Sequence, residues 1–484
     1  MTLETPAVTF ELSSYGGTLR RARLREEKFF LKKGDPSSGI NVVPTAEPET
    51  APLRVTFPES DFELPEAGVW HVERPAPDTV VFRTETDAVR VEKRYKADPA
   101  RYRLRLDVQV ENRSAKSQDH HLAIHMFARQ DPGKKGGSFL TAASDSIAQV
   151  VCHVNEKAER RSVEDLAKEP LDKVGAVRWL GADEKFFLVA AVPHPETPPR
   201  ERTCAARTRT VDTAAGALTF AERTVPPGAN TAYAVTVFAG PKVISELDDV
   251  QPGGQDARLG EAVDVTLAVI SRPLLSLLKL FYRFAGNWGL AIILLTVFVK
   301  AVTFYPTQRA LMSAKRMQRL APKLSAIRRK FENDRQRQGA ETMNLYKSHG
   351  VNPFGGCLPS LIQMPIWIAL YSTLMYAVEL HRSAFFGHIQ DLTAKDPYFI
   401  TPLVMGAVMY VQMKMSPASP DNQQQKMMQI MMPVMFTGFS LVLPSGLAVY
   451  MLTSYLIGIL QQLLVNHLDR KAHGTMPAAE PAAR

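Results

Sequence analysis

A run of twenty mostly apolar residues, NWGLAIILLTVFVKAVTFYP at 287–306, constrains the fold of this chain more than any other feature. As one helix it would be about 30 Å long, which matches the hydrocarbon core of a bilayer. Trp288 and Tyr305 stand near its ends, where aromatic side chains meet lipid headgroups. With the apolar runs that follow it, this segment predicts five transmembrane spans, at 286–306, 356–381, 398–415, 427–443 and 445–466. The last two are so close that we expect a tight helical hairpin.

The charge of the chain divides near residue 260, where its hydropathy also changes. The 484 residues carry a net charge of +9, but residues 1–260 hold 36 Lys and Arg against 38 Asp and Glu. The remainder holds 22 basic and 11 acidic side chains. A basic excess confined to the membrane part is not the signature of a nucleic-acid partner, so we predict no nucleic-acid binding.

Basic residues also orient the chain in the membrane. Between the first two spans, residues 307–355 hold eleven Lys and Arg but only three acidic residues. Because loops rich in Lys and Arg stay in the cytoplasm, we place this segment inside. Residues 1–286 then lie outside, in the periplasm of a bacterium that has one, and the tail at 467–484 lies in the cytoplasm.

The cytoplasmic segment 307–350 has the pattern of a basic helical hairpin. Its apolar residues follow the spacing of a heptad seam at Met317, Leu320, Leu324, Ile327 and Phe331. Residues 332–334 offer a turn before a second helical stretch. The basic side chains form either a solvated face or a docking surface for anionic lipid, a ribosome or a nascent chain. The candidates are Arg316, Arg319, Lys323, Arg328, Arg329 and Lys330.

Residues 1–250 are typical of a β-rich domain. Apolar and polar side chains alternate at 89–95 and 102–110, which predicts half-buried antiparallel strands. Apolar runs at 186–192 and 232–238 predict buried strands. We therefore expect a sandwich of antiparallel sheets, with a loop at 33–68.

The segment 258–285 connects this domain to the first span and is amphipathic. Its polar side chains recur at helical spacing, at Arg272, Ser276, Lys279 and Arg283. It is either a helix of the β-domain core or a helix that lies along the membrane surface. We favour the surface helix because the span follows within three residues.

The N-terminal half carries no sequence signature of a catalytic or phosphate-binding site. His120, His121 and His125 lie close together, but no carboxylate or cysteine has ligand spacing, so we expect a partly exposed sheet edge. We predict no metal, no cofactor and no enzymatic activity. Cys152 and Cys204 are either a disulfide in an oxidising compartment or two buried thiols, and the sequence leaves both open.

Lys300 is the one charged residue within the apolar run of the first span. A charged side chain inside the membrane costs about 2.5–3.5 kcal/mol on insertion scales. Lys300 either extends to the cytoplasmic interface or faces a wet cavity. Thr296 and Thr303 share its helical face, and we expect their hydroxyls to line the same cavity. Because no intramembrane acid is an obvious partner, we predict that the cavity receives polar, often acidic, peptide segments.

Four segments resemble the YidC family of membrane protein insertases and follow the order of that family. They are NWG at 287–289, VNPFGGCLP at 351–359, LIQMP at 361–365 and PSG at 444–446. The resemblance covers residues 260–470, and residues 5–245 more loosely. It implies an α+β, multidomain fold with a periplasmic β-super-sandwich, an interfacial helix and a five-helix transmembrane core with a cytoplasmic helical hairpin.

The resemblance also implies a function and a site. The function is to insert nascent membrane proteins into the bacterial inner membrane and help them fold, with the general secretion translocon, the ribosome and anionic lipids as further partners. The family usually has an arginine where this chain has Lys300, and members with a periplasmic domain often have two tyrosines where it has Tyr450 and Met451. We therefore predict a substrate groove formed by Lys300, Thr296, Thr303, Gln363, Gln412, Tyr450 and Met451. Methionines would line a path for apolar helices, at Met405, Met409, Met427, Met428, Met431, Met432 and Met435.

The start of the chain differs from that of Gram-negative relatives, and two other functions are alternatives to insertion. Gram-negative relatives begin with an additional membrane helix, whereas Met1 leads directly into β-like sequence. We therefore expect either an internal start codon or a truncated chain.

A small-solute transporter is the first alternative function, but no internal repeat is evident. A carbohydrate-active outer domain is the second, but it lacks a paired-carboxylate signature.

Overall fold

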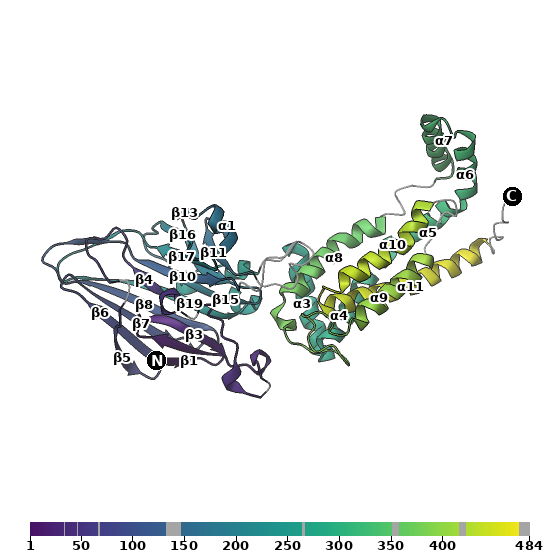
Figure 1. The fold of residues 1–484 in the computed structure, drawn as a ribbon. Helices are drawn as coiled ribbons and strands as arrows, with labels where there is room; N and C mark the ends of the chain where they lie inside the picture. Colours follow the sequence, from purple (N-terminus) through teal and green to yellow (C-terminus); the bar gives the residue numbers. More distant parts are fainter. Residues whose placement is uncertain are drawn as a thin grey trace. The chain divides into compact units, whose positions relative to one another are not determined.

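The computed structural model describes residues 1–484 except 33, 46, 66–67, 132–146, 264–266, 351–357, 416–422 and 474–484. The chain divides near residue 264 into an N-terminal unit of strands and a C-terminal unit of helices (Figure 1). This confirms the coarse expectation of a β-rich part followed by a helical part. Most of the expected motif at 351–359 lies outside the described residues.

Antiparallel strands build the N-terminal unit, in two larger and two smaller sheets. The nine-stranded sheet has the order β12 (Lys157–Ser162), β11 (Gln149–Val154), β14 (Val177–Asp183), β15 (Phe187–Pro193), β19 (Asn230–Pro241), β8 (Arg103–Asn112), β7 (Val89–Ala97), β6 (Thr79–Glu85) and β5 (His71–Ala76). The five-stranded sheet has the order β13 (Leu171–Gly175), β16 (Arg202–Thr208), β17 (Thr213–Thr219), β10 (Ala123–Arg129) and β4 (Arg54–Thr56). The smaller sheets are β1 (Thr2–Glu4), β2 (Val8–Ser13) and β3 (Thr18–Leu24), and β18 (Arg223–Val225) with β9 (Gln118–His120). Two short helices, α1 (Val163–Lys168) and α2 (Ile244–Asp248), complete the unit.

The four strands expected from the sequence are present as β7, β8, β15 and β19. Side chains of β7 and β8 alternate between buried and more exposed positions, as their sequence pattern predicted. The expected loop at 33–68 is wrong in one place, because β4 pairs with β10 at the edge of the five-stranded sheet. Its Val55 is buried in that edge.

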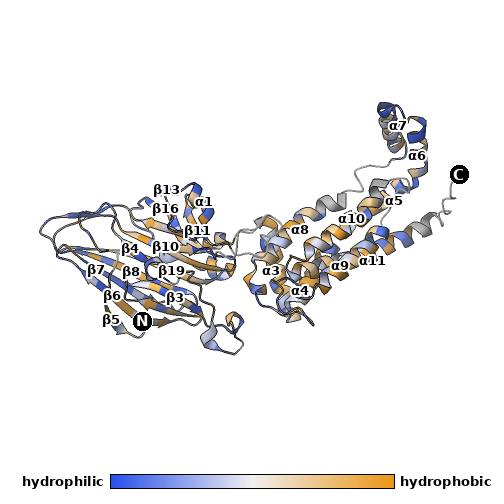
Figure 2. Ribbon diagram, in the orientation of Figure 1, coloured by the Kyte–Doolittle hydropathy of each residue, from blue (hydrophilic) through white to orange (hydrophobic). Residues whose placement is uncertain are grey.

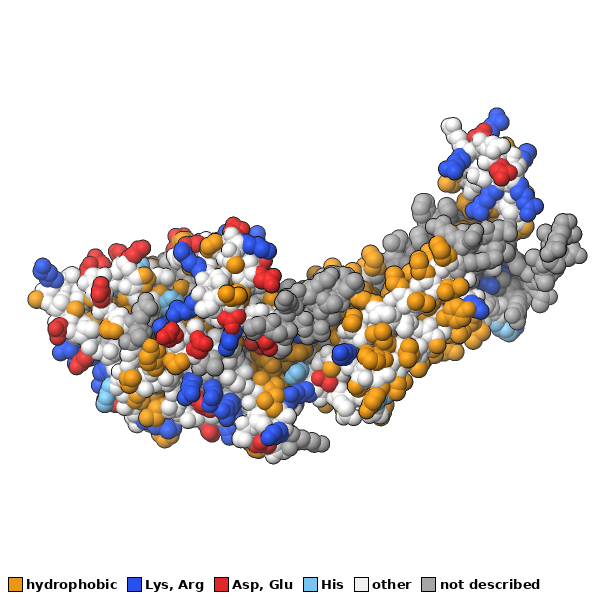
Figure 3. Space-filling model, in the orientation of Figure 1, with side chains coloured by type: hydrophobic (Ala, Val, Ile, Leu, Met, Phe, Trp, Pro, Cys, Tyr) orange, Lys and Arg blue, Asp and Glu red, His pale blue; other side chains and the backbone are white. Residues whose placement is uncertain are grey.

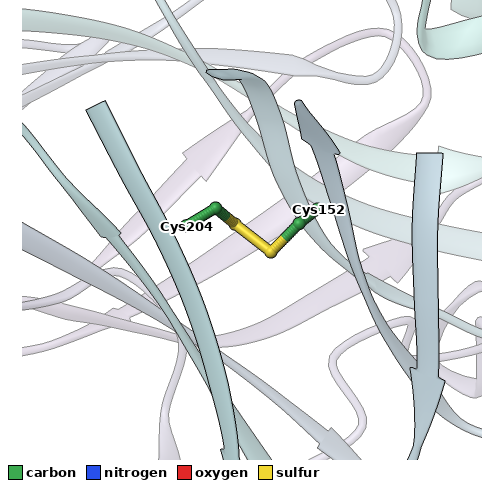
Figure 4. Close-up of a disulfide and its surroundings, with 2 residues drawn as sticks. All are labelled: Cys152 and Cys204. Carbon is green, nitrogen blue, oxygen red and sulfur yellow. A yellow bond between two sulfur atoms is a disulfide. The ribbon is translucent and has the colours of Figure 1, made fainter. Parts of the chain in front are cut away.

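A disulfide between Cys152 and Cys204 answers the question that the sequence left open (Figure 4). Cys152 belongs to β11 and Cys204 to β16, so the bond joins the nine-stranded sheet to the five-stranded sheet. Both cysteines are fully buried. Gly216 of β17 lets the sheets approach, since a Cβ there would lie only 2.7 Å from the side chain of Val150. The two sheets therefore face each other across one core.

Lys93 of β7 lies on the inner side of the sheet and is fully buried. Its ammonium donates to the backbone carbonyls of Gly16, Gly17 and Leu53, at 3.1, 2.5 and 2.6 Å. Burial holds the pKa of this amine well below its ordinary value. These three bonds tie the β2–β3 turn and the approach to β4 to the nine-stranded sheet.

His120 of β9 is also fully buried, so a partly exposed sheet edge is wrong at this position. Its Nε2 lies 3.0 Å from the hydroxyl of Tyr233, and the rings of Phe57 and Phe62 pack beside it. Burial lowers the pKa of His120 to about 4. The folded unit therefore holds a neutral imidazole here at neutral pH.

Nine of the described helices form the C-terminal unit. They are α3 (Ala268–Ala285), α4 (Trp288–Val302), α5 (Phe304–Arg319), α6 (Ala321–Lys330), α7 (Arg335–Ser348), α8 (Leu358–Tyr376), α9 (Ile400–Met415), α10 (Gln423–Ser440) and α11 (Ser445–His473). α3 buries Leu274, Leu275 and Leu278 and packs on α4. The hydroxyl of Ser271 in α3 also donates to the carbonyl of Ala369 in α8.

The first predicted span does not run as one helix to residue 306. α4 ends at Val302, and α5 leaves it at an angle of 62°. Pro306 explains the position of the break, because proline has no amide hydrogen to donate to the carbonyl four residues earlier and its ring crowds that carbonyl. Among the described helices, one segment, Ser445–Leu468, is long and apolar enough to cross a membrane alone, and the bent α4–α5 pair meets the same criterion together.

The predicted tight hairpin of the last two spans is also wrong in its packing. Both α10 and α11 pack against α9, and they pack much less against each other. The segment that leads into α9 causes this, because it pairs with the start of α11. The amides of Ser445 and Gly446 donate to the carbonyls of Ala394 and Leu392, at 2.8 and 2.9 Å.

Within the basic segment 307–350, α6 and α7 form a hairpin joined by a turn at 331–334. The side chain of Asp334 accepts the amide hydrogen of Arg337 and caps α7. Lys323 Nζ lies 3.1 Å from His349 Nε2, which links the two open ends. The heptad seam is not continuous, because α5 ends before Leu320.

Replacing both disulfide cysteines by alanine should destabilise the N-terminal unit. Opening a cross-link between residues 52 positions apart restores entropy to the unfolded chain, so we expect a loss of about 2–4 kcal/mol. Urea titration of the purified protein, followed by tryptophan fluorescence, measures this. Reductant should lower the stability of the parent protein and leave the double variant unchanged; equal responses would contradict the cross-link.

Acid should weaken the N-terminal unit through His120. The unfolded side chain titrates near pH 6.5, whereas the pKa in the fold is about 4. The unfolded chain therefore binds the extra proton first, and stability falls as the pH drops from about 6.5 to 4, by at most ~3 kcal/mol from this residue. Urea titrations at pH 7 and pH 5 measure the loss, and His120→Gln should reduce it. An identical loss in His120→Gln would exclude His120 as its source.

Candidate functional site

A pocket of about 350 Å³ lies among the helices of the C-terminal unit. We name it the Lys300 pocket. α4, α5, α8, α9 and α11 supply its wall, which consists of Lys300, Thr307, Leu311, Gln363, Trp367, Gln412, Tyr450, Met451, Ser454, Tyr455, Gly458, Gln461 and Gln462. Hydroxyl and amide groups predominate among these side chains, and Lys300 carries the only charge on the described wall.

Five of the seven predicted groove residues meet in this pocket. They are Lys300, Gln363, Gln412, Tyr450 and Met451, and they come from four helices. The amide Nε2 of Gln363 donates to the hydroxyl of Tyr450 at 2.8 Å, which connects α8 to α11. Residues up to 151 positions apart in sequence thus share one polar wall.

Thr296 and Thr303 do not line the Lys300 pocket, so that expectation is wrong. Thr296 is fully buried, and its hydroxyl donates to the carbonyl of Ile292 at 2.7 Å. The hydroxyl of Thr303 donates to the carbonyl of Val299 at 2.8 Å. A threonine inside a helix readily satisfies itself on the preceding turn, so a shared helical face did not bring these hydroxyls to the cavity.

Several wall residues on α11 were not predicted. Ser454, Gly458 and Gln461 continue the face that begins at Tyr450, at spacings of four, four and three residues. This spacing is that of one helical face. Tracing the polar positions of the last span along this face would have found Gln461 and its neighbour Gln462.

The Lys300 side chain is half-buried at the wall of the pocket. No residue within the described ranges forms a hydrogen bond or an ion pair with its ammonium. Charges inside membrane proteins are usually paired or face water, because an isolated charge in hydrocarbon is costly. The geometry is therefore that of a cationic site that an anionic group can approach.

Apolar side chains cover much of the outer surface of the C-terminal helices (Figures 2 and 3). The more exposed ones include Val302 on α4, Leu403 on α9, Val434 on α10 and Leu460 on α11. A contiguous apolar surface of this kind is typical of contact with lipid or with another helix.

The seven methionines of the predicted apolar path divide into two groups. Met427, Met428, Met431 and Met435 are exposed on α10, and Met432 is half-buried there. Met405 and Met409 are buried in α9. The α10 residues are therefore available to a partner, whereas the α9 pair belongs to the helix packing.

The six predicted docking residues lie at the end of α5 and on α6. Arg316, Lys323, Arg328, Arg329 and Lys330 are exposed, and Arg319 is half-buried. Consecutive basic side chains at 328–330 end α6, where positive charge also complements the helix dipole. Among the described residues, no group of three or more His, Cys, Asp or Glu side chains could hold a metal ion.

Comparisons with known proteins match both units of the chain. The family model described as 60Kd inner membrane protein matches residues 280–472, and that described as YidC periplasmic domain matches residues 1–277. The membrane protein insertase YidC of Syntrophus aciditrophicus is 33% identical over 478 residues, which cover 96% of this chain and 84% of the relative. The membrane protein insertase YidC of Anaeromyxobacter sp. (strain Fw109-5) is 34% identical over 465 residues, or 93% of this chain and 81% of the relative. A solved structure of an active YidC insertase with its first transmembrane domain resolved aligns over 96% of this chain and 91% of that one, at 18% identity and a TM-score of 0.39.

Thiol labelling distinguishes the pocket wall from the interior of α4. In a variant without Cys357, a cysteine at Gln412 should react with a water-soluble maleimide, because this side chain lines the Lys300 pocket. A cysteine at Thr296 is the matched control and should react at least about tenfold more slowly, since this position is fully buried. Labelling rates measured by mass spectrometry test this, and equal rates at the two positions would contradict a wet pocket.

Proposed function

Because this chain belongs to the YidC family of membrane protein insertases, we propose that it inserts proteins through the Lys300 pocket. Its substrates are nascent membrane proteins, and it acts in the bacterial inner membrane. The polar segment of a substrate enters the pocket while its apolar helix passes into lipid.

The observation that carries this proposal is the half-buried Lys300, for which the described residues supply no ion-pair partner. A structural lysine would be expected to have its charge satisfied within the fold, as Lys93 has. Lys300 instead faces amides and hydroxyls that can bind either donors or acceptors. Such a wall suits a polar peptide of varied sequence, with a preference for acidic groups.

The physical barrier to insertion is the cost of moving polar groups through hydrocarbon. A polar pocket within the helical unit shortens the distance over which the segment lacks partners. Burial of the apolar helix of the substrate in lipid then favours release. The exposed methionines of α10 are suited to this passage, because flexible thioether side chains adapt to apolar surfaces of different shapes.

The proposed topology has five spans, formed by the bent α4–α5 pair, α8, α9, α10 and α11. The positive charge at the C-terminal end of α5 and on α6 and α7 supports a cytoplasmic position for these segments. The Cys152–Cys204 disulfide supports a periplasmic position for the N-terminal unit, because disulfides persist in oxidising compartments. α3 would lie along the outer membrane–water interface.

The hairpin of α6 and α7 is the proposed docking element on the cytoplasmic side. The exposed cations at 328–330 suit an anionic partner, such as an acidic lipid headgroup or an acidic segment of a nascent chain. We propose the general secretion translocon as a further partner on the basis of family membership alone.

Changing the sign of the charge at Lys300 should impair insertion of acidic substrates. Two like charges about 8 Å apart repel by ~2 kcal/mol at an effective dielectric of 20, so Lys300→Glu should lower insertion about tenfold or more. Lys300→Arg keeps the charge and should insert at close to the parent rate. Protease protection of a single-span substrate in proteoliposomes measures both.

The same substrate with its acidic residues changed to Asn and Gln is the control. It should enter the Lys300→Glu variant nearly as well as the parent protein. Normal insertion of the acidic substrate by Lys300→Glu would refute the role of the charge. Solute leakage through the liposomes without insertion would instead favour a transporter.

A further inference from the structure

A buried amide of α11 reaches the backbone just beyond the break between α4 and α5. The side chain of Gln461 is 6% exposed, and its Nε2 donates to the carbonyl of Phe304 at 3.3 Å. Phe304 is the first residue of α5. The bond therefore connects α11 directly to the start of the bent segment.

Locally, the break is held by the backbone of Thr303, whose amide donates to the Val299 carbonyl at 3.0 Å and whose carbonyl accepts from the Thr307 amide at 3.1 Å. Pro306 cannot donate to the Val302 carbonyl. The hydroxyl of Thr303 is directed back along α4, to the carbonyl of Val299 at 2.8 Å. Side chains of neighbouring helices commonly stabilise the backbone where a membrane helix is broken, and Gln461 is placed to do so here.

The break also lies within the wall of the Lys300 pocket. Lys300 precedes Thr303 by one helical turn, and Thr307 follows it by one turn; Lys300, Thr307 and Gln461 all line the pocket. A change in the bend would therefore move the last turn of α4 relative to the α11 wall. The direction of the Lys300 side chain depends on that angle.

We propose that Gln461 is a positioning residue for insertion. Its bond to the Phe304 carbonyl fixes the bend between α4 and α5 and thereby holds the Lys300 ammonium at the pocket. This inference rests on the proposed function and adds a residue that acts through Lys300, without requiring contact with the substrate.

Gln461→Met tests the proposal, because methionine has a similar length but no amide. Spin labels at Leu294 on α4 and Arg316 on α5 report the bend, and their distance distribution should broaden and shift to longer distances as the bend relaxes. Insertion of an acidic single-span substrate should fall about fivefold, and its Asn/Gln counterpart should change less than twofold. In a Lys300→Met background, Gln461→Met should cause no further loss, because both changes remove the same positioned charge.

Gln429→Met is the matched control. It removes another amide-to-carbonyl bond between helices, from Gln429 Nε2 of α10 to the carbonyl of Met413 in α9 at 3.2 Å, and neither of these residues lines the Lys300 pocket. It should leave both the label distance and insertion unchanged.

An unchanged label distance in Gln461→Met would overturn the proposal, as would full additivity with Lys300→Met. A shifted distance with normal insertion would also overturn it, since the bend would then have no role in positioning. Failure of the parent protein to insert any substrate would refute the proposed function itself, and this outcome is distinguishable because the label distances do not depend on substrate.

Discussion

One missing hydrogen-bond donor shapes the helical unit. Pro306 cannot bond to the carbonyl of Val302, and α5 leaves α4 at 62° just before it. Lys300 lies one turn before the break and Thr307 one turn after it, so both segments contribute to one polar wall. A straight helix over 287–306 would carry these side chains along one continuous axis. Because of the bend, the α4 part and the α5 part of the pocket wall lie at an angle to each other, and α11 packs against both segments.

Lys93 and Lys300 illustrate opposite solutions to the cost of an unsolvated charge. Lys93 donates to three backbone carbonyls and is thereby part of the scaffold of the β-rich unit. Lys300 faces a pocket, and within the described residues its ammonium has no such acceptors. The first arrangement stabilises one conformation, whereas the second leaves binding capacity for a guest. The contrast supports the proposal that Lys300 belongs to a binding site, whereas Lys93 belongs to the scaffold.

The sequence predicted the elements better than their arrangement. Alternation located β7 and β8, because the side-chain period of a strand is a local property. Lys93 occupies an inward position of that alternation although it is a lysine. Local sequence did not predict its burial, because the carbonyls that accept its hydrogen bonds come from residues about 40 and 77 positions earlier. The pairing of Cys152 with Cys204 depends on how two sheets face each other, which spacing cannot reveal. Lys300, Gln363 and Gln412 were identified from polarity within apolar spans, and Tyr450 and Met451 from the family resemblance. Thr296 and Thr303 were misplaced because helical facing does not tell whether a hydroxyl bonds to its own backbone.

The position of α9 between α10 and α11 determines how the helical unit is packed. Two consecutive helices with a short connection would ordinarily enter the membrane together as a finished pair. Here the connection at 441–444 crosses the leading end of α9, and Ser445 and Gly446 are bonded to the segment in front of it. α9 is thus enclosed by the two helices that follow it, and α11, the longest helix described, both completes this packing and carries most of the pocket wall.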